Sequence, residues 1–186
     1  MTATATRERL IQAARQCLLE RGHQDCSVKV IAEQAGVNHG LVHHYFGSKE
    51  RLWLAVMASE AERIRASLAV PPDRFLEGFY VPEWLQRADR LRLMVEFLGL
   101  AKALPEAAKA LCEQFRLHRQ MVHRHLGLAD ETTATLVCAT LFGLAIQSGL
   151  DAELPVEAAV ARLLGMLALS RETRAEGPAP STRRQR

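Results

Sequence analysis

The chain has 186 residues, a length that allows one well-buried domain or a small domain joined to a larger one. Its formal net charge is +3. Five arginines and two glutamates in residues 171–186 carry the whole charge excess, so any basic surface for nucleic acid must be local. We recognise no signal peptide and no run approaching the roughly 18 apolar residues of a membrane span. We therefore expect a cytoplasmic protein without a membrane partner.

An all-α fold is predicted, because apolar residues recur with helical spacing and almost nowhere alternate as strand residues do. The first helix is expected over residues 6–22, with Leu10 and Leu18 facing the core and Arg15 facing solvent. Thr6 would cap its start.

Two short helices joined by a tight turn are predicted next. Ser27 is a suitable N-cap for the first of them, and Gly36 suits a turn with positive φ. Asn38 would cap the second helix, whose buried side would carry Val42 and Phe46. This spacing is typical of a helix-turn-helix unit.

A longer helix is expected from Ser48 to Ala66, and prolines at positions 71, 72 and 82 interrupt the chain after it. Asp73 would cap a further helix, and four more are predicted from their start and stop residues over residues 84–103, 105–126, 130–149 and 155–171, which brings the total to about nine.

The four cysteines, Cys17, Cys26, Cys112 and Cys138, are scattered and form no CxxC pair. This pattern favours reduced thiols in the core over a disulfide framework or a zinc ribbon. Cys26 directly precedes a predicted helix, whose N-terminus favours a thiolate, so a redox switch there is the alternative to a passive cysteine.

The second short helix carries an unusual number of histidines. With Val42 and Phe46 buried, its outward positions are occupied by His39, Gly40, His43 and His44. Polar side chains beside a small residue suit the base edges of a DNA major groove, and the helix N-terminus suits phosphate. One alternative is that these histidines are simply solvated. Another is that His39 and His43 share a metal ion, but two ligands rarely make a site. DNA contact is favoured, and no metal is expected.

Residues 7–53 resemble the DNA-binding region of the TetR family of one-component transcriptional regulators. The resemblance rests on the run I-A-x-x-A followed by G-V-x-x-G-x-x-x-x-Y-F-x-x-K-x-x-L, which starts at Ile31 and ends at Leu52. It departs from the family pattern at Leu41, where many members carry a hydroxyl, and at His43, where many carry an aromatic residue.

The resemblance implies contacts for individual residues of this region. Those expected to contact phosphate are Ser27, Asn38, Tyr45 and Lys49. Those expected to read bases are Lys29, His39, Gly40 and His43, with His44 at the edge of that surface.

The region after residue 70 has aromatic and soft side chains suited to a small-molecule pocket, and the TetR resemblance implies a ligand cavity there. For each residue alone, ordinary core packing is the alternative. The candidate lining residues are Trp84, Met94, Phe97, Phe115, His118 and Phe142, with Phe75, Phe79 and Met121 also considered. The candidate groups for orienting a ligand are Glu96, Arg116, His118 and Gln147.

The last two predicted helices are apolar over much of their circumference, and the close-packing residues Ala139 and Gly143 are four apart. A second copy of the chain would cover this surface, and a fully buried hairpin within one chain is the alternative. The resemblance also implies a homodimer, which would separate two recognition helices by roughly 34 to 36 Å or a multiple and read a palindromic operator.

Three parts of the chain are therefore predicted: a helix-turn-helix DNA-binding domain over residues 1–47, a ligand-binding and dimerisation domain over residues 48–172, and a disordered tail over residues 173–186. The predicted function is a ligand-responsive transcriptional regulator, with repression favoured over activation, that needs no cofactor and is not an enzyme. The alternative is a helical carrier or enzyme that does not use DNA, but no nucleophile elbow, metal-ligand helix or phosphate-binding glycine loop is recognisable.

Overall fold

The structure is a computed structural model that describes residues 3–67 and 88–175. All regular structure in these residues is helical, which confirms the all-α prediction, and the eight described helices approximately match the expected nine. In chain order they are α1 (Ala3–Asp25), α2 (Val28–Ala35), α3 (Gly40–Phe46), α4 (Lys49–Ser67), α7 (Ala88–Ala103), α8 (Pro105–His125), α9 (Glu131–Ser148) and α10 (Val156–Ala175).

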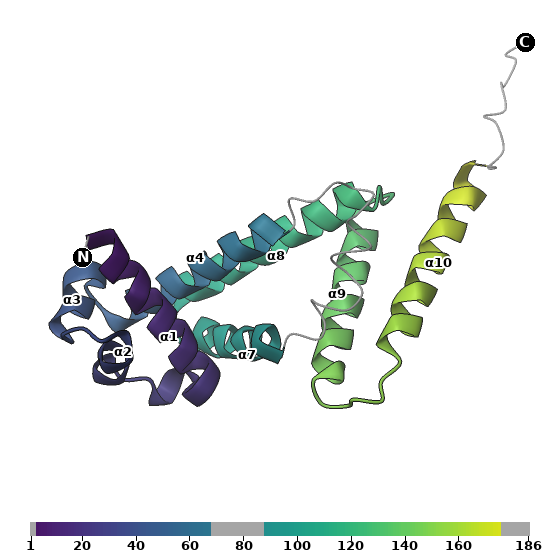
Figure 1. Ribbon diagram of the computed structural model, residues 1–186. Helices are drawn as coiled ribbons and strands as arrows, with labels where there is room; N and C mark the ends of the chain where they lie inside the picture. Colours follow the sequence, from purple (N-terminus) through teal and green to yellow (C-terminus); the bar gives the residue numbers. More distant parts are fainter. Residues whose placement is uncertain (1–2, 68–87, 176–186) are drawn as a thin grey trace, which may run out of the picture.

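The helices form an elongated molecule with α1, α2 and α3 at one end and α9 and α10 at the other (Figure 1). Helix α4 leaves the N-terminal unit and runs beside α8, so it belongs to both halves. The N-terminal core contains Leu10, Ile31, Val42 and Leu52, one from each of the first four helices, and all are fully buried. Helix α4 therefore connects the two halves.

Most predicted helix starts are confirmed. Ser27 Oγ accepts a hydrogen bond from the N–H of Val30 at 3.2 Å, and Asp130 Oδ1 accepts one from the N–H of Thr133 at 2.7 Å. The cap assigned to Thr6 is wrong, because α1 already begins at Ala3 and Thr6 is buried inside it. The helix can start this early because alanines favour helix, and because water can satisfy the first N–H groups of a helix.

The reduced-thiol prediction is wrong for two of the four cysteines. Cys17 in α1 and Cys26 just before α2 form a disulfide bond, and both side chains are fully buried. Gly22 has φ 78° and ψ 163°, which breaks α1 and turns the chain back so that the two sulfurs meet. Cys112 and Cys138 are free thiols, and burial raises the pKa of Cys138 to about 11.

The C-terminal half is built from α7, α8 and α9, with α10 packed against α9. Helix α10 continues to Ala175, past the expected helix end at residue 171 and past the expected start of the tail at residue 173. Residues 176–186 lie outside the described residues, as do the expected helical residues 84–87. No helix within the described ranges is long and apolar enough to cross a bilayer.

Candidate functional site

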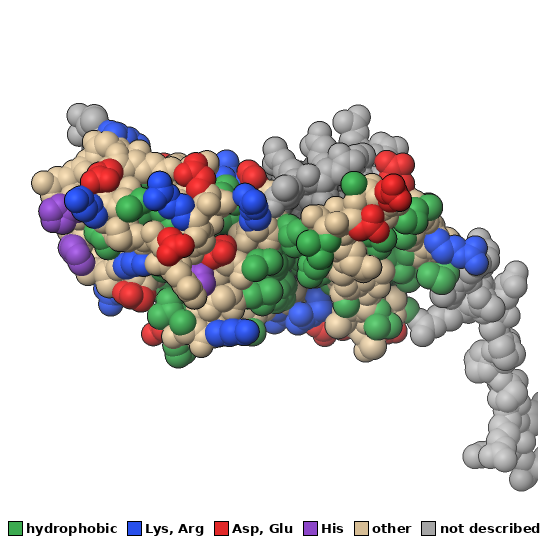
Figure 2. Space-filling view, turned by 90° about the horizontal axis from the view of Figure 1, so that it is seen from below, with side chains coloured by type: hydrophobic (Ala, Val, Ile, Leu, Met, Phe, Trp, Pro, Cys, Tyr) green, Lys and Arg blue, Asp and Glu red, His purple; other side chains and the backbone are tan. Residues whose placement is uncertain are grey.

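Helix α3 exposes the face that its spacing predicted. Val42 and Phe46 are 0% and 6% exposed, whereas His39, Gly40, His43 and His44 are exposed. Histidine side chains gather at the end of the molecule where α3 lies, beside lysines and arginines (Figure 2). The described residues contain no group of three histidine, cysteine or acidic side chains placed to hold a metal ion.

The start of α3 is set by Asn38, as expected, although Asn38 lies one residue before the helix cap. Its Oδ1 accepts a hydrogen bond from the N–H of Gly40 at 2.8 Å, while His39, the cap residue itself, makes no side-chain cap bond. A Cβ atom at Gly40 would lie 3.2 Å from that Oδ1, so any other residue there would crowd the turn. The amide NH2 group of Asn38 is directed by this bond and is the group suited to a phosphate.

The other predicted DNA contacts lie in or beside α2 and α3. The Lys29 side chain is 80% exposed, and its ammonium is 3.9 Å from a carboxylate oxygen of Glu33. Such an exposed pair contributes little to stability and can be exchanged for a phosphate at small cost. The Lys49 ammonium lies 5.7 Å from the centre of the Trp53 ring, and Tyr45 is half-buried with its ring in a T-shaped contact with the His44 ring.

Two arginines of α1 hold this unit together, and sequence reasoning missed their role. Arg9 donates hydrogen bonds to the carbonyl oxygens of Ala35 and Gly36, which form the turn between α2 and α3. The guanidinium of Arg7 lies 5.3 Å from the centre of the Phe46 ring. No local pattern marks the contact of Arg9, because its carbonyl partners lie 26 and 27 residues further along the chain.

A second candidate site is a cavity among α4, α7, α8 and α9, with about 550 Å³ of space that is partly open to solvent. It brings together five of the six predicted lining residues, Met94, Phe97, Phe115, His118 and Phe142. The sixth, Trp84, lies outside the described residues, as do Phe75 and Phe79. The remaining described lining residues are Glu60, Ile64, Leu93, Leu111 and Gln114.

His118 is a neutral polar group in the wall of this cavity. Its side chain is buried, and burial lowers the pKa of its imidazole from 6.5 to about 4. The ring lies 5.4 Å from that of Phe142, which packs edge-on against Phe115 at the same centroid distance. This wall is therefore mainly aromatic and is uncharged at neutral pH.

Three of the four polar residues expected to orient a ligand do not line the cavity. Glu96 accepts hydrogen bonds from the backbone N–H and the ring Nδ1 of His23, both at 2.7 Å. Arg116 pairs with Glu113 on the exposed side of α8, and the exposed Gln147 donates to a carbonyl oxygen of its own helix. One helical residue turns a side chain by about 100°, so proximity in sequence to Phe97 or Phe115 did not place these groups inside.

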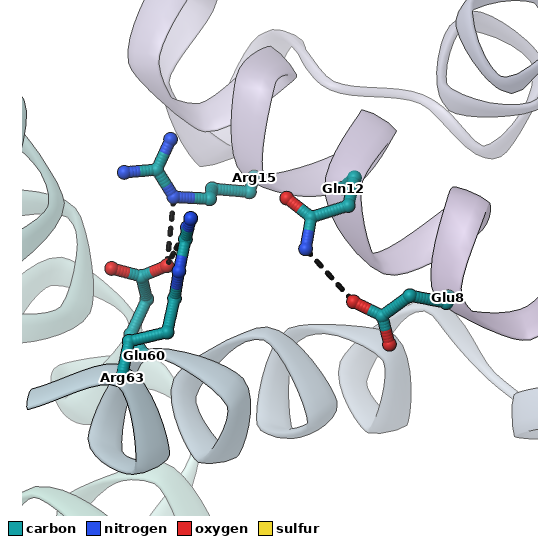
Figure 3. A network of polar contacts seen from close by, with 5 residues as sticks. All are labelled: Glu8, Gln12, Arg15, Glu60 and Arg63. Carbon is teal, nitrogen blue, oxygen red and sulfur yellow. Dashed lines mark hydrogen bonds and ion pairs between the residues drawn. The ribbon is translucent and has the colours of Figure 1, made fainter. Parts of the chain in front are cut away.

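Glu60 is the carboxylate that lines the cavity instead. It is 7% exposed, and its Oε1 accepts hydrogen bonds from Arg15 Nε at 2.7 Å and from Arg63 at 3.2 Å (Figure 3). The prediction that Arg15 faces solvent is wrong, because its side chain is only 18% exposed and reaches from α1 to α4. This ion pair joins the helix-turn-helix unit to a wall of the cavity.

The far end of the molecule exposes apolar side chains on α9, on α10 and on the connection between them. The most exposed large ones there are Leu136, Ile146, Leu150 and Met166, between 45% and 87% exposed. Ala139 is also exposed, and among the described residues a Cβ atom at Gly143 would meet only Gln147 of the same helix, at 4.0 Å. These helices therefore present a surface that a further apolar partner could cover.

Residues 10–56, which run from α1 through α2 and α3 into α4, match the family described as bacterial regulatory proteins, tetR family. Among solved structures, a transcriptional regulator from Rhodococcus sp. Rha1 matches with a TM-score of 0.75 and 25% sequence identity, over 88% of this chain and 96% of that one. The chain carries a TetR-family DNA-binding region.

Curated relatives of this chain share a shorter segment with it. The HTH-type transcriptional repressor AcnR of Corynebacterium glutamicum is 34% identical over 61 residues, which are 33% of this chain and 32% of the relative. The HTH-type transcriptional regulator BetI of Brucella anthropi is 49% identical over 51 residues, 27% of this chain and 26% of the relative. The chain thus spans about a third or less of the length of these relatives.

Proposed function

We propose that this TetR-family protein is a transcriptional repressor that binds a palindromic operator as a homodimer and releases it when a small molecule occupies the cavity. The observation that carries the proposal is the exposed polar face of α3, on a helix-turn-helix unit that α4 connects directly to a cavity. The relatives support this class, since AcnR is named as a transcriptional repressor. They do not favour the alternative of a carrier or enzyme that does not use DNA.

DNA recognition is assigned to α3 and its surroundings. His39, Gly40 and His43 would meet base edges, because they occupy the exposed face of a short helix that can enter a major groove. Lys49 and the amide of Asn38 would hold phosphates on either side of α3 and so set its orientation. The bonds from Arg9 to the turn keep α2 and α3 in one fixed arrangement before DNA is met.

Dimerisation is assigned to α9 and α10, whose exposed apolar residues would be covered by the same helices of a second copy. Two identical recognition helices would then face the same side of the duplex, so the operator would be an approximate palindrome.

Release would follow from a shift in population. The free dimer holds its recognition helices at a separation that fits DNA, and an effector that binds better to another separation lowers operator affinity. Helix α4 is placed to connect the two, because it contributes Glu60 and Ile64 to the cavity wall and packs against α1 and α3.

The proposal is tested by selecting bound sequences from a random duplex pool with the full-length protein at two salt concentrations. We expect enrichment of one palindrome, whose affinity exceeds that for a shuffled duplex by at least about a thousandfold. Weak binding that depends on salt but not on sequence would contradict a specific operator.

A further inference from the structure

The charge pattern of the cavity separates the ligands it can take from those it rejects. Among the described residues that line it, Glu60 is the only acidic one. Gln114 is a neutral amide and His118 a neutral imidazole, and the rest of the described wall is apolar. Three phenylalanine rings, from α7, α8 and α9, provide faces and edges against which a flat ring system can pack.

The carboxylate of Glu60 has acceptor capacity left for a ligand. Both of its ion pairs, to Arg15 and to Arg63, are made by the same oxygen, Oε1. A carboxylate offers about four lone-pair sites on its two oxygens, so two bonds do not saturate it. A ligand group that donates a hydrogen bond can therefore be accommodated there.

The same cavity wall disfavours an anionic ligand. No lysine or arginine is among the described residues that line the cavity. The arginines that balance Glu60 reach it from α1 and from the next turn of α4 (Figure 3). A ligand carboxylate would lose its hydration against apolar walls and lie near a like charge, and both effects oppose binding.

We infer that the cavity binds an aromatic molecule that donates a hydrogen bond to Glu60, as a phenol or an arylmethylamine does, and that it rejects aromatic carboxylic acids. The inference rests on the proposed function in treating this cavity as the effector site. It also links binding at that site to the DNA-binding unit. A donor bound at the remaining acceptor sites of Glu60 shares the carboxylate charge that holds Arg15, and so weakens a link between α4 and α1.

The test is a calorimetric titration of the full-length protein with four probes that share one ring system: 2-naphthol, 2-naphthylmethylamine, 2-methoxynaphthalene and 2-naphthoate. The first two donate a hydrogen bond, the third only accepts one, and the fourth is an anion. We expect 2-naphthol to bind at least about tenfold more tightly than 2-methoxynaphthalene and 2-naphthoate. The comparison of naphthol with the amine shows whether the site prefers a neutral or a cationic donor.

A matched pair of variants assigns the discrimination to Glu60. In Glu60→Gln, which removes the charge and keeps the shape, the preference for naphthol over naphthoate should fall by about tenfold. The control is Glu62→Gln, because Glu62 lies two residues further along α4 and is exposed. This variant should leave the preference unchanged. Circular dichroism of both variants checks that they are folded.

Several outcomes would overturn the inference. It fails if 2-naphthoate binds the wild-type protein as tightly as 2-naphthol, a result that needs no variant to fold, or if no probe binds at millimolar concentration. If the probes are discriminated as expected but no operator is ever selected, the ligand class stands and the repressor function fails. If an operator is selected and the probes are not discriminated, the proposed function stands and this inference fails.

Discussion

Lys49 and His43 are proposed to make two different kinds of DNA contact, and substituting each residue should distinguish the two. Lys49→Ala removes a charge at the start of α4, so it should weaken binding to every duplex similarly and reduce the slope of log affinity against log salt by about one unit. His43→Ala removes a group from the exposed face of α3, so it should mainly change which operator bases are preferred. Fluorescence anisotropy titrations with the selected operator and a shuffled duplex measure both effects.

The control for this pair is Lys102→Ala, which removes an exposed lysine from α7 and should leave both quantities unchanged. An equal loss of sequence preference from Lys49→Ala and His43→Ala would contradict the two roles.

His118 should make folding stability depend on pH. Burial lowers the pKa of its imidazole to about 4 from 6.5, so the unfolded chain takes up a proton before the folded one as pH falls. The stabilisation is complete above pH 6.5 and is lost as pH falls toward about 4. Between pH 7 and pH 5 the wild-type protein should therefore lose about 2 kcal/mol more unfolding free energy than His118→Gln.

Urea unfolding of both proteins at one protein concentration measures that difference. Carboxylates titrate in both proteins and cancel in the comparison. Parallel losses in wild type and variant would show that His118 is protonated as readily in the folded state as in the unfolded chain.

At the scale of elements, the junction of α1 and α2 depends on one covalent link. The Cys17–Cys26 disulfide spans nine residues, and a loop of this size is stabilised by about 2 to 3 kcal/mol in the chain-entropy model. Reduction should lower the free energy of unfolding by that amount. Thiol titration of the denatured, unreduced protein should find only the two free cysteines, Cys112 and Cys138.

Two variants check this assignment. Reductant should lower the free energy of unfolding of Cys112→Ser as much as that of the wild type. It should not change the free energy of unfolding of the double variant Cys17→Ser, Cys26→Ser. Four reactive thiols before reduction would mean that the disulfide is not formed.

Element boundaries were predictable wherever a local bond defines them. Ser27 and Asp130 cap their helices through their own side chains, so a residue type at one position is enough to place the start. The start of α1 and the end of α10 carry no such bond among the described contacts, and both helices extend beyond their expected limits.

For the whole molecule, the exposed face of α9 leads to a prediction about assembly. Gly143→Glu places a charge on the apolar surface assigned to the dimer, where burial of an unpaired carboxylate is costly, so it should shift the protein toward monomer. Equilibrium sedimentation measures the shift. Ala103→Glu, the same kind of substitution at an exposed position on α7, serves as the control. If the Gly143→Glu protein is as dimeric as the control, α9 is not part of the interface.

The sequence by itself determined the all-α fold, the helix-turn-helix unit and the outward face of α3. These follow from helical periodicity and from capping residues, which act over a few neighbouring positions. It also identified most of the aromatic cavity wall, because large apolar side chains mark the buried faces of helices. Only the tertiary structure decided the Cys17–Cys26 bond, the Arg9 contacts with the turn and the Arg15–Glu60 pair. Arg15 and Glu60 are 45 residues apart, and their meeting depends on how α1 and α4 are oriented, which no local pattern records.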